Sequence, residues 1–335
     1  MELIFHIGAG KTGSSSIQQT LKNSSERLIA EGFLYTGLIF ESNVDHIYQW
    51  QNVSKIEDFH ALSVSETKNQ LSNLLKNIIE KAEKDNINTI IWSNESFFGR
   101  ASKVLSVLKE FEKMGHRIKI IAYVRRHDSW ARSAYIQWGL KHKTYKGDIQ
   151  PFAQWIKKRK PRFSKGIREV LDIFPETFYI RNMDVTSDVV NDFLTLCGIS
   201  TSKIDKIRDN DSPGNEELFL RTLFNSNFNG QVLPQRFDNT LGRELDYKHT
   251  INEYMDLLLP SKEEIDNIRR EVKEDWEETN EMLVKKGQPP LQDSPLPEKD
   301  YHVNEEKLMK VLCEIVLKQS IRINRLEALL KEKDV

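Results

Sequence analysis

A short stretch near the start of the chain gathers glycine, lysine and hydroxyl side chains in one loop. Residues 6–16 read His-Ile-Gly-Ala-Gly-Lys-Thr-Gly-Ser-Ser-Ser, between an apolar run typical of a buried strand and a stretch typical of a helix. Backbone N–H groups at a helix N-terminus attract anions, glycines let the backbone approach a ligand, and Lys11 adds a positive charge. The loop is therefore predicted to bind a phosphate or sulfate group. The simpler interpretation is a helix cap with ordinary turn glycines.

The residues Gly10, Lys11 and Thr12 also suggest the phosphate-binding loop of enzymes that use ATP. That loop carries a glycine five residues before the glycine that precedes the lysine. The corresponding residue here is Phe5, inside the predicted strand, so the loop is too short for that template. No obvious acidic ligand for magnesium follows a predicted strand. A P-loop phosphotransferase that uses ATP is thus a disfavoured alternative.

A second informative stretch covers residues 118–138. It places Arg125 at the end of a predicted strand and Ser133 in the first turns of the helix that follows. Arginine presents a planar fork of donors and serine a single short donor, so the two can converge on one phosphate. Taken alone, the stretch has a simpler interpretation, in which Arg125 pairs with an acid such as Asp128 and Ser133 is a small helix residue.

Together, the two stretches resemble the nucleotide-binding motifs of sulfotransferases that use 3′-phosphoadenosine 5′-phosphosulfate (PAPS). The family's 5′-phosphosulfate loop is commonly written Pro-Lys-Thr-Gly-Thr-Thr-Ser. Six residues match it in type, with Gly10 in place of the proline: Lys11, Thr12, Gly13, Ser14, Ser15 and Ser16. The family's 3′-phosphate motif consists of a strand, an arginine, a short turn, a serine and often a tyrosine. Arg125, Ser133 and Tyr135 match these positions. The match is specific over residues 3–16 and 118–138 and diffuse up to about residue 200.

The resemblance implies an enzyme that transfers the sulfuryl group of PAPS to a hydroxyl or an amine, without a metal ion. Lys11 would then stabilise the leaving phosphate, and the loop up to Ser16 would hold the 5′ end of the nucleotide. Arg125 and Ser133 would bind the 3′-phosphate. A site built to pair with that group disfavours nucleotides that lack it, because Arg125 would lose its partner.

The acceptor must also lose a proton, which calls for a base. Glu95 follows the predicted strand 89–92, and the carboxyl ends of parallel strands meet at one edge of a sheet. Glycan sulfotransferases often place a catalytic glutamate after this strand, and the sequence Ser-Asn-Glu-Ser-Phe-Phe looks similar, which favours a carbohydrate or glycolipid acceptor. Phe97 and Phe98 are expected to desolvate the carboxylate in part. His6 is the second candidate, since some relatives use a histidine; the simpler interpretation of Glu95 is a surface or capping acid.

The elements that position these residues alternate between apolar strands and amphipathic helices. Strands are predicted at residues 3–7, 89–92, 118–124 and 177–180, and helices at 14–31, 65–84, 103–114, 128–141 and 189–197. This alternation predicts an α/β fold, a three-layer parallel sheet of the P-loop or sulfotransferase type. After residue 210 the pattern changes, which predicts a core domain at 1–210 and a mostly helical C-terminal extension at 211–335. Residues 33–60 show no recognisable organisation.

Charge and composition narrow the range of partners. The 335 residues carry 49 basic and 50 acidic side chains, so the basic excess usual for nucleic-acid binding is missing. The two cysteines, Cys197 and Cys313, favour reduced thiols, although a single bridge is not excluded. The first residues do not resemble a secretory signal, and no stretch reaches the length of a membrane span. We therefore expect a cytoplasmic protein that binds a nucleotide and a small acceptor.

Two long helices are predicted in the extension, at residues 261–286 and 305–331. The second carries apolar residues near one face: Leu308, Val311, Leu312, Ile315, Ile323, Leu326 and Leu330. Exposure of that face would be costly, so we expect it to pack on its own domain or in a homodimer, the latter disfavoured because the heptads are few. A non-enzymatic nucleotide-binding or scaffold protein, with this helix as its interaction element, is a further alternative to an enzyme.

Overall fold

The computed structural model describes residues 1–207, 214–241, 255, 258–297, 299, 301 and 304–333. It contains a five-stranded sheet in the order β2-β3-β1-β4-β5, in which every neighbouring pair is parallel. The strands are β1 (Glu2–His6), β2 (Phe33–Tyr35), β3 (Thr89–Ser93), β4 (Arg117–Val124) and β5 (Phe178–Asn182). The predicted α/β class with a parallel sheet is confirmed, and β2 is a strand that the sequence did not predict.

The chain forms two compact units. The first contains Met1–His127, Arg162–Asn210 and Val272–Asp293, and the second contains Asp128–Pro161, Asp211–Glu271 and Ser294–Val335. One boundary between the units falls between residues 210 and 211, where the sequence suggests the start of the helical extension. The division into domains 1–210 and 211–335 stays a prediction.

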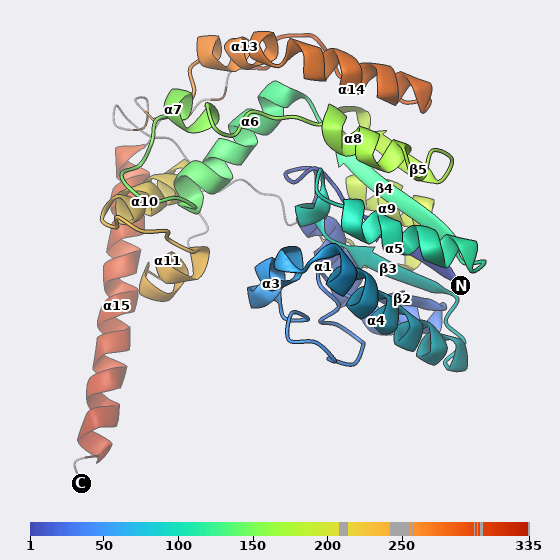
Figure 1. The fold of residues 1–335 in the computed structure, drawn as a ribbon. Coiled ribbons are helices and arrows are strands. Elements are labelled where there is room, and N and C mark those ends of the chain that lie inside the picture. The colour runs from blue at the N-terminus through green and yellow to red at the C-terminus, as the bar shows by residue number, and fades with distance from the viewer. Residues whose placement is uncertain are drawn as a thin grey trace. The chain divides into compact units, whose positions relative to one another are not determined.

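In the first unit, helices cover both faces of the sheet, so the predicted three layers are confirmed (Figure 1). One face carries α1 (Ser14–Asn23) and α9 (Val189–Cys197), and the other carries α4 (Val64–Lys84), α5 (Ser102–Lys113) and α8 (Ser164–Leu171). The unit also contains α2 (Ser25–Ala30), α3 (Ile56–Ala61), α14 (Lys273–Lys285) and 3₁₀ turns at Val53–Lys55, Glu95–Phe97, Met183–Val185 and Thr201–Lys203.

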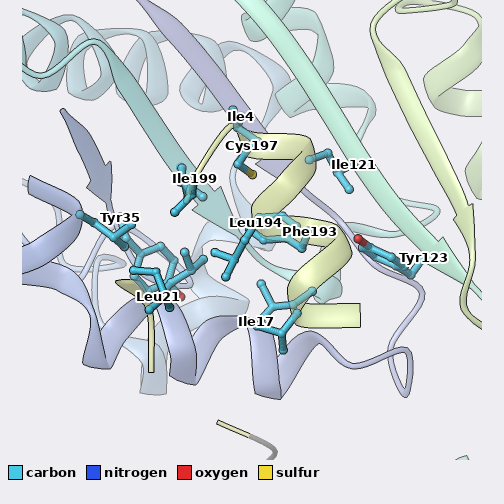
Figure 2. Close-up of a cluster of buried hydrophobic side chains, with 14 residues drawn as sticks. Ile4, Ile17, Leu21, Tyr35, Ile121, Tyr123, Phe193, Leu194, Cys197 and Ile199 are labelled. Atoms are coloured by element: carbon cyan, nitrogen blue, oxygen red, sulfur yellow. The ribbon is translucent and has the colours of Figure 1, made fainter. Parts of the chain in front are cut away.

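An apolar core lies between the sheet and the α1/α9 layer, which explains why the strands are continuous runs of apolar residues. Figure 2 shows Ile17 of α1 and Phe193 of α9 packed with Ile121 of β4. Side chains alternate along a strand, so consecutive residues of β1 face opposite layers. Phe5 stacks on Trp92 with ring centroids 4.3 Å apart, while His6 lies 5.2 Å from the ring of Phe193 on the α9 side. The last residue of β1 is therefore buried under the helices that follow the loop.

Most of residues 33–60, for which the sequence predicted no organisation, is anchored on the sheet by an aromatic cluster. Phe40 packs on Trp92 with ring centroids 4.4 Å apart, and Phe59 packs edge-on against Phe97 at 5.6 Å. Trp50 contacts both Phe40 and Phe59. Aromatic pairs of this kind are long-range contacts without a local period, which is why the sequence pattern gave no sign of them.

Several helix boundaries differ from the prediction. The helix predicted at 14–31 breaks at Ser24 into α1 and α2, and the one predicted at 261–286 breaks at Val272 into α13 (Lys262–Glu271) and α14. Helix α4 begins at Val64, one residue earlier than predicted, and Ser63 caps it, because Ser63 and Glu66 form a reciprocal capping box. Local propensity cannot distinguish neighbouring serines, whereas the cap geometry does.

The second unit is helical. Besides α13 it contains α6 (His127–Tyr135, with His127 in the first unit), a π-helix at Ile136–Lys141, α7 (Phe152–Ile156), α10 (Asn215–Ser226), α11 (Pro234–Leu241) and α15 (Glu305–Lys333). The predicted helix 128–141 thus changes type after Tyr135. Gly139 is required there, because a Cβ at this residue would lie 2.4 Å from the Tyr135 ring. Tyr135 packs between Phe152 and Trp155.

The structure also describes the hydrophobicity of the helices and the state of the two cysteines. In the part of the chain that the structure describes, no helix combines the length and the hydrophobicity needed to cross a membrane. Cys197 is buried, Cys313 is exposed, and neither forms a disulfide.

Asp275 joins α14 to the rest of the first unit through four hydrogen bonds. Its carboxylate accepts from His127 Nε2 at 2.7 Å, from the amides of Phe163 and Ser164 at 2.7 and 3.2 Å, and from Ser164 Oγ at 2.7 Å. Burial alone would raise the pKa of Asp275, but the hydrogen bonds from His127, Ser164 and Phe163 outweigh it and lower the pKa. His127 is therefore a structural residue.

We expect Asp275→Ala to destabilise the protein by about 2–4 kcal/mol, because it leaves a buried imidazole and two amides without their acceptor. Glu274→Ala, an exposed neighbour in the same first turn of α14, is the control and should change little. Chemical denaturation of both variants measures the difference. The pKa of Asp275 is lower in the folded state than in the unfolded chain. The loss of unfolding free energy in Asp275→Ala should therefore be largest above the ordinary carboxyl pKa, and it should shrink as pH falls through the lowered pKa. A pH-independent deficit would contradict the assignment.

Candidate phosphosulfate site

The loop between β1 and α1 has a left-handed backbone at three residues. The φ angles are 61° at Gly10, 54° at Lys11 and 88° at Gly13. Proline holds φ near −65°, so the proline of the family motif could not adopt the conformation that Gly10 has here. Lys11 has a β-carbon and still adopts this region, a conformation that costs about 1–3 kcal/mol and is concentrated at binding sites.

Three buried polar atoms converge beside Gly8 in this loop. A Cβ at Gly8 would lie 2.9 Å from Ser14 Oγ, 3.0 Å from Thr12 Oγ1 and 3.1 Å from His6 Nε2. All three atoms are inaccessible to solvent, and none has a hydrogen-bond partner in the structure. Buried polar groups without partners are rare because each loses its water at a cost. The absence of a side chain at Gly8 thus leaves three hydrogen-bonding atoms directed at one point.

The start of α1 adds a favourable electrostatic field to this point. Gly13 is the N-cap of the helix, and no side chain caps its first turn. Unsatisfied N–H groups there carry partial positive charge, which stabilises an anion. Gly13 is also held tightly, since a Cβ on it would lie 2.5 Å from Val189 Cγ1 at the start of α9. Of the other motif residues, Ser16 is buried, Lys11 is partly exposed and Ser15 is exposed.

Arg125 contacts the loop directly. Its Nη1 donates a 3.0 Å hydrogen bond to the carbonyl of Lys11, and the amide of Ala9 donates to the carbonyl of Tyr123 at 3.2 Å. The end of β4 therefore braces the loop, and binding of the 3′-phosphate by Arg125 stays a prediction. Ser133 lies eight residues further on, in the part of α6 that belongs to the second unit, and is partly buried.

Tyr135, the third residue that follows the family's 3′-phosphate motif, is buried in the second unit. Its hydroxyl donates to the carbonyl of Gln150 at 2.8 Å. That hydrogen bond and the ring contacts with Phe152 and Trp155 give it a packing role.

Glu95 lies beside α1 at the same edge of the sheet. His6 and Ser93 are register partners at the ends of β1 and β3, and Glu95 follows two residues later. Gln18 Nε2 donates to Glu95 Oε2 at 2.7 Å. Gln18 is four residues after Ser14, so both lie on one side of α1. Ser14, which supplies one of the three convergent atoms, and Gln18, which holds the Glu95 carboxylate, thus lie on the same face of α1.

The aromatic residues after Glu95 have partners of their own. Phe97 is part of the cluster with Phe5 and Trp92, and the ring of Phe98 lies against Gly166 and Phe163. The contact that the structure gives to the Glu95 carboxylate is the amide of Gln18. Desolvation of Glu95 by Phe97 and Phe98 stays a prediction.

His6, the second candidate base, is completely buried. Burial lowers the pKa of His6 to about 3, so the imidazole is neutral at physiological pH. Its Nδ1 lies 2.7 Å from Ser93 Oγ, which holds the ring so that Nε2 points at the convergence beside Gly8. A group with so low a pKa is a weak proton acceptor. The geometry therefore suits His6 to a hydrogen bond with a ligand, and its low pKa makes it a poor candidate for the base.

Two features near this edge were not found from the sequence. His60, in the unorganised segment, lies 3.0 Å from Ser96 Oγ through its Nε2, and burial followed by the charge of Arg100 lowers its pKa. Arg181 Nε donates to Asp192 Oδ2 at 2.9 Å, and Tyr123 donates to the same oxygen at 2.7 Å. Arg181 and Asp192 line a cavity of about 440 Å³ at the start of α9. Both residues lie where the sequence match to the family is diffuse, and nothing in the sequence indicated their pairing.

Comparison with known proteins gives little to add to this geometry. No family model matches the chain, and no curated protein matches it. A solved structure, the sulfotransferase domain from the Synechococcus PCC 7002 olefin synthase, is similar with a TM-score of 0.30 and 12% sequence identity, covering 60% of this chain and 74% of that one. A TM-score this low supports no functional inference.

Proposed function

We propose that the chain is a sulfotransferase that moves the sulfuryl group of PAPS to a hydroxyl or amine, with a carbohydrate or glycolipid as the favoured acceptor. The observation that carries the proposal is the convergence of His6 Nε2, Thr12 Oγ1 and Ser14 Oγ beside Gly8. A sulfate or phosphate oxygen accepts hydrogen bonds from two hydroxyls and an imidazole N–H at once, which would satisfy all three atoms. The loop that holds them matches the 5′-phosphosulfate motif in residue type.

The positive groups around the convergence beside Gly8 complement the negative charge of PAPS. When bound, PAPS supplies the sulfuryl group that is transferred. Thr12, Ser14 and the first turn of α1 hold the oxygens at its 5′ end, and Lys11 offsets the negative charge that develops on the leaving phosphate. Arg125 and Ser133 bind the 3′-phosphate, as the family motif implies. His6 remains neutral and donates a hydrogen bond.

Glu95 acts as the general base in this proposal. A bond forms between the acceptor oxygen or nitrogen and sulfur as the bond between sulfur and the bridging phosphate oxygen breaks. The acceptor proton passes to the Glu95 carboxylate, and 3′,5′-ADP leaves with the electron pair of the broken bond. Gln18 orients the carboxylate through Oε2, which leaves Oε1 for the acceptor. Positioning and electrostatics supply most of the rate in reactions of this type.

The ATP-dependent alternative is disfavoured by the position of Phe5. The first glycine of an ATP-binding loop would have to replace it, yet Phe5 is buried in β1 and stacks on Trp92. Turnover of PAPS with a panel of hydroxyl and amine acceptors, read by product mass, tests the proposed activity. Binding of ATP in preference to 3′,5′-ADP would favour the phosphotransferase instead. Binding of 3′,5′-ADP without turnover of any acceptor would favour the non-enzymatic alternative.

The role of Arg125 is tested with two nucleotides that differ by one phosphate. Arg125→Ala is expected to weaken 3′,5′-ADP binding by one to two decades more than 5′-AMP binding, since a lost charge-assisted contact is worth about 1.5–3 kcal/mol. Calorimetry with both ligands gives the difference. Because Arg125 also braces the Lys11 carbonyl, some loss is expected for both. Equal losses for the two would mean that Arg125 only supports the loop.

A further inference from the structure

Helix α15 carries two apolar stripes. The sequence pattern had predicted a single apolar face that included residues of both. The first stripe packs inside the second unit, where Val311 and Ile315 are 1% and 8% exposed against Leu220 of α10 and Phe237 of α11. Figure 1 shows α10 and α11 beside the first part of α15, whose remainder extends beyond them. The expectation that the helix packs on its own domain is therefore met by part of its apolar surface only.

The second stripe follows a heptad repeat and is exposed. Positions a and d of the repeat are Met309, Leu312, Val316, Gln319, Ile323, Leu326 and Leu330. The apolar members are 38–64% exposed, with Leu312 at the lower limit and Val316 at the upper. An exposed apolar stripe that continues over three heptads marks an interaction surface.

We infer that this stripe is the seam of a parallel two-stranded coiled coil formed with a second copy of the chain. β-Branched residues at a with leucine at d favour two parallel strands, and here Val316 and Ile323 occupy a while Leu312 and Leu326 occupy d. The remaining seam positions are Met309 and Leu330 at a and Gln319 at d, none of which is β-branched. This inference concerns assembly and does not depend on the proposed activity.

Charged residues beside the seam also favour a second copy of the chain as the partner and a parallel orientation of the two helices. Arg322 is at position g and Glu327 is at position e, five residues later, and both are exposed. In a parallel dimer in register, g of one helix meets e of the next heptad on the other, so Arg322 of each copy faces Glu327 of the other. Two-fold symmetry produces this pair twice.

The polar residue of the seam is already hydrogen-bonded. Gln319, at the middle d position, donates to the carbonyl of Thr240 at 2.8 Å. Burial of the seam therefore leaves at least one N–H of this amide with its partner, which lowers the cost of association.

Cysteine cross-linking tests the seam in the full chain. In a Cys313→Ser background, Leu326→Cys at position d should form a disulfide-linked dimer under mild oxidation, because the two d side chains meet in register. Ile321→Cys is a matched control, since both residues are 51% exposed and lie five residues apart on α15, but Ile321 is at the outer position f. Equal rates at the two positions, or no cross-link at Leu326, would overturn the parallel seam.

Light scattering on charge-bearing variants tests the assembly itself. Wild-type protein should have the mass of two chains, and the double variant Ile323→Glu with Leu326→Glu should raise the dimer dissociation constant by at least about 100-fold, because four charges enter the seam. The control pair Leu317→Glu with Ile321→Glu, at positions b and f, should remain dimeric. A wild-type chain that is monomeric at every concentration would overturn the inference, and its binding to lipid vesicles would assign the stripe to a membrane surface instead.

Discussion

Replacement of Glu95 by glutamine is expected to lower kcat by about 10²–10⁴-fold, the usual contribution of a positioned base. Glutamine keeps the size of the side chain and can still accept the hydrogen bond from Gln18, so the local structure should persist. It can no longer take up the acceptor proton. Affinity for 3′,5′-ADP should remain nearly unchanged, because in the proposed mechanism the carboxylate acts on the acceptor.

The control for this experiment is Glu57→Gln. Glu57 is an exposed carboxylate on α3, and its ion-pair distance to Arg100 is 4.0 Å, so it should be neutral for both kcat and nucleotide affinity. Steady-state rates and calorimetry on the two variants separate chemistry from binding. If Glu95→Gln keeps its kcat, Glu95 is not the base. If it loses nucleotide affinity instead, the carboxylate holds the site together.

Replacement of Gly8 by alanine is expected to lower the affinity for 3′,5′-ADP by roughly 10²-fold or more. The added methyl group would lie about where the proposed ligand oxygen lies, within 3.1 Å of Ser14 Oγ, Thr12 Oγ1 and His6 Nε2. Loss of hydrogen bonds to a charged group costs about 1.5–3 kcal/mol each. Gly8 does not have a positive φ, so alanine is compatible with its backbone conformation.

Gly230→Ala is the matched control, because a Cβ there meets nothing within 4 Å and φ is again ordinary. Calorimetry measures nucleotide affinity, and the melting temperature shows whether each variant is folded. If Gly8→Ala unfolds, Thr12→Ala with Ser14→Ala removes two of the donors without adding volume and should give a similar loss. Full nucleotide affinity in a folded Gly8→Ala protein would refute the assignment of this point to the ligand.

The main layers of the fold could be predicted because their signals are local. The apolar runs of β1, β3, β4 and β5 are short and flanked by amphipathic helices, which is sufficient for a parallel sheet covered on both faces. The same runs predict which residues follow strand ends, so Lys11, Glu95 and Arg125 could be assigned to one edge. β2 was missed because it has three residues and its partner, β3, is more than fifty residues away.

The amino-acid sequence by itself determined the α/β class and predicted an anion-binding loop with the candidates Lys11, Glu95 and Arg125, because residue type, spacing and period are properties of neighbouring residues. Only the tertiary structure decided which atoms meet. Strand register and helix packing direct His6 toward Thr12 and Ser14 beside Gly8, and these contacts have no period in the sequence. Burial, which lowers the pKa of His6 and separates the packed stripe of α15 from the exposed one, likewise depends on neighbours that are distant in the chain.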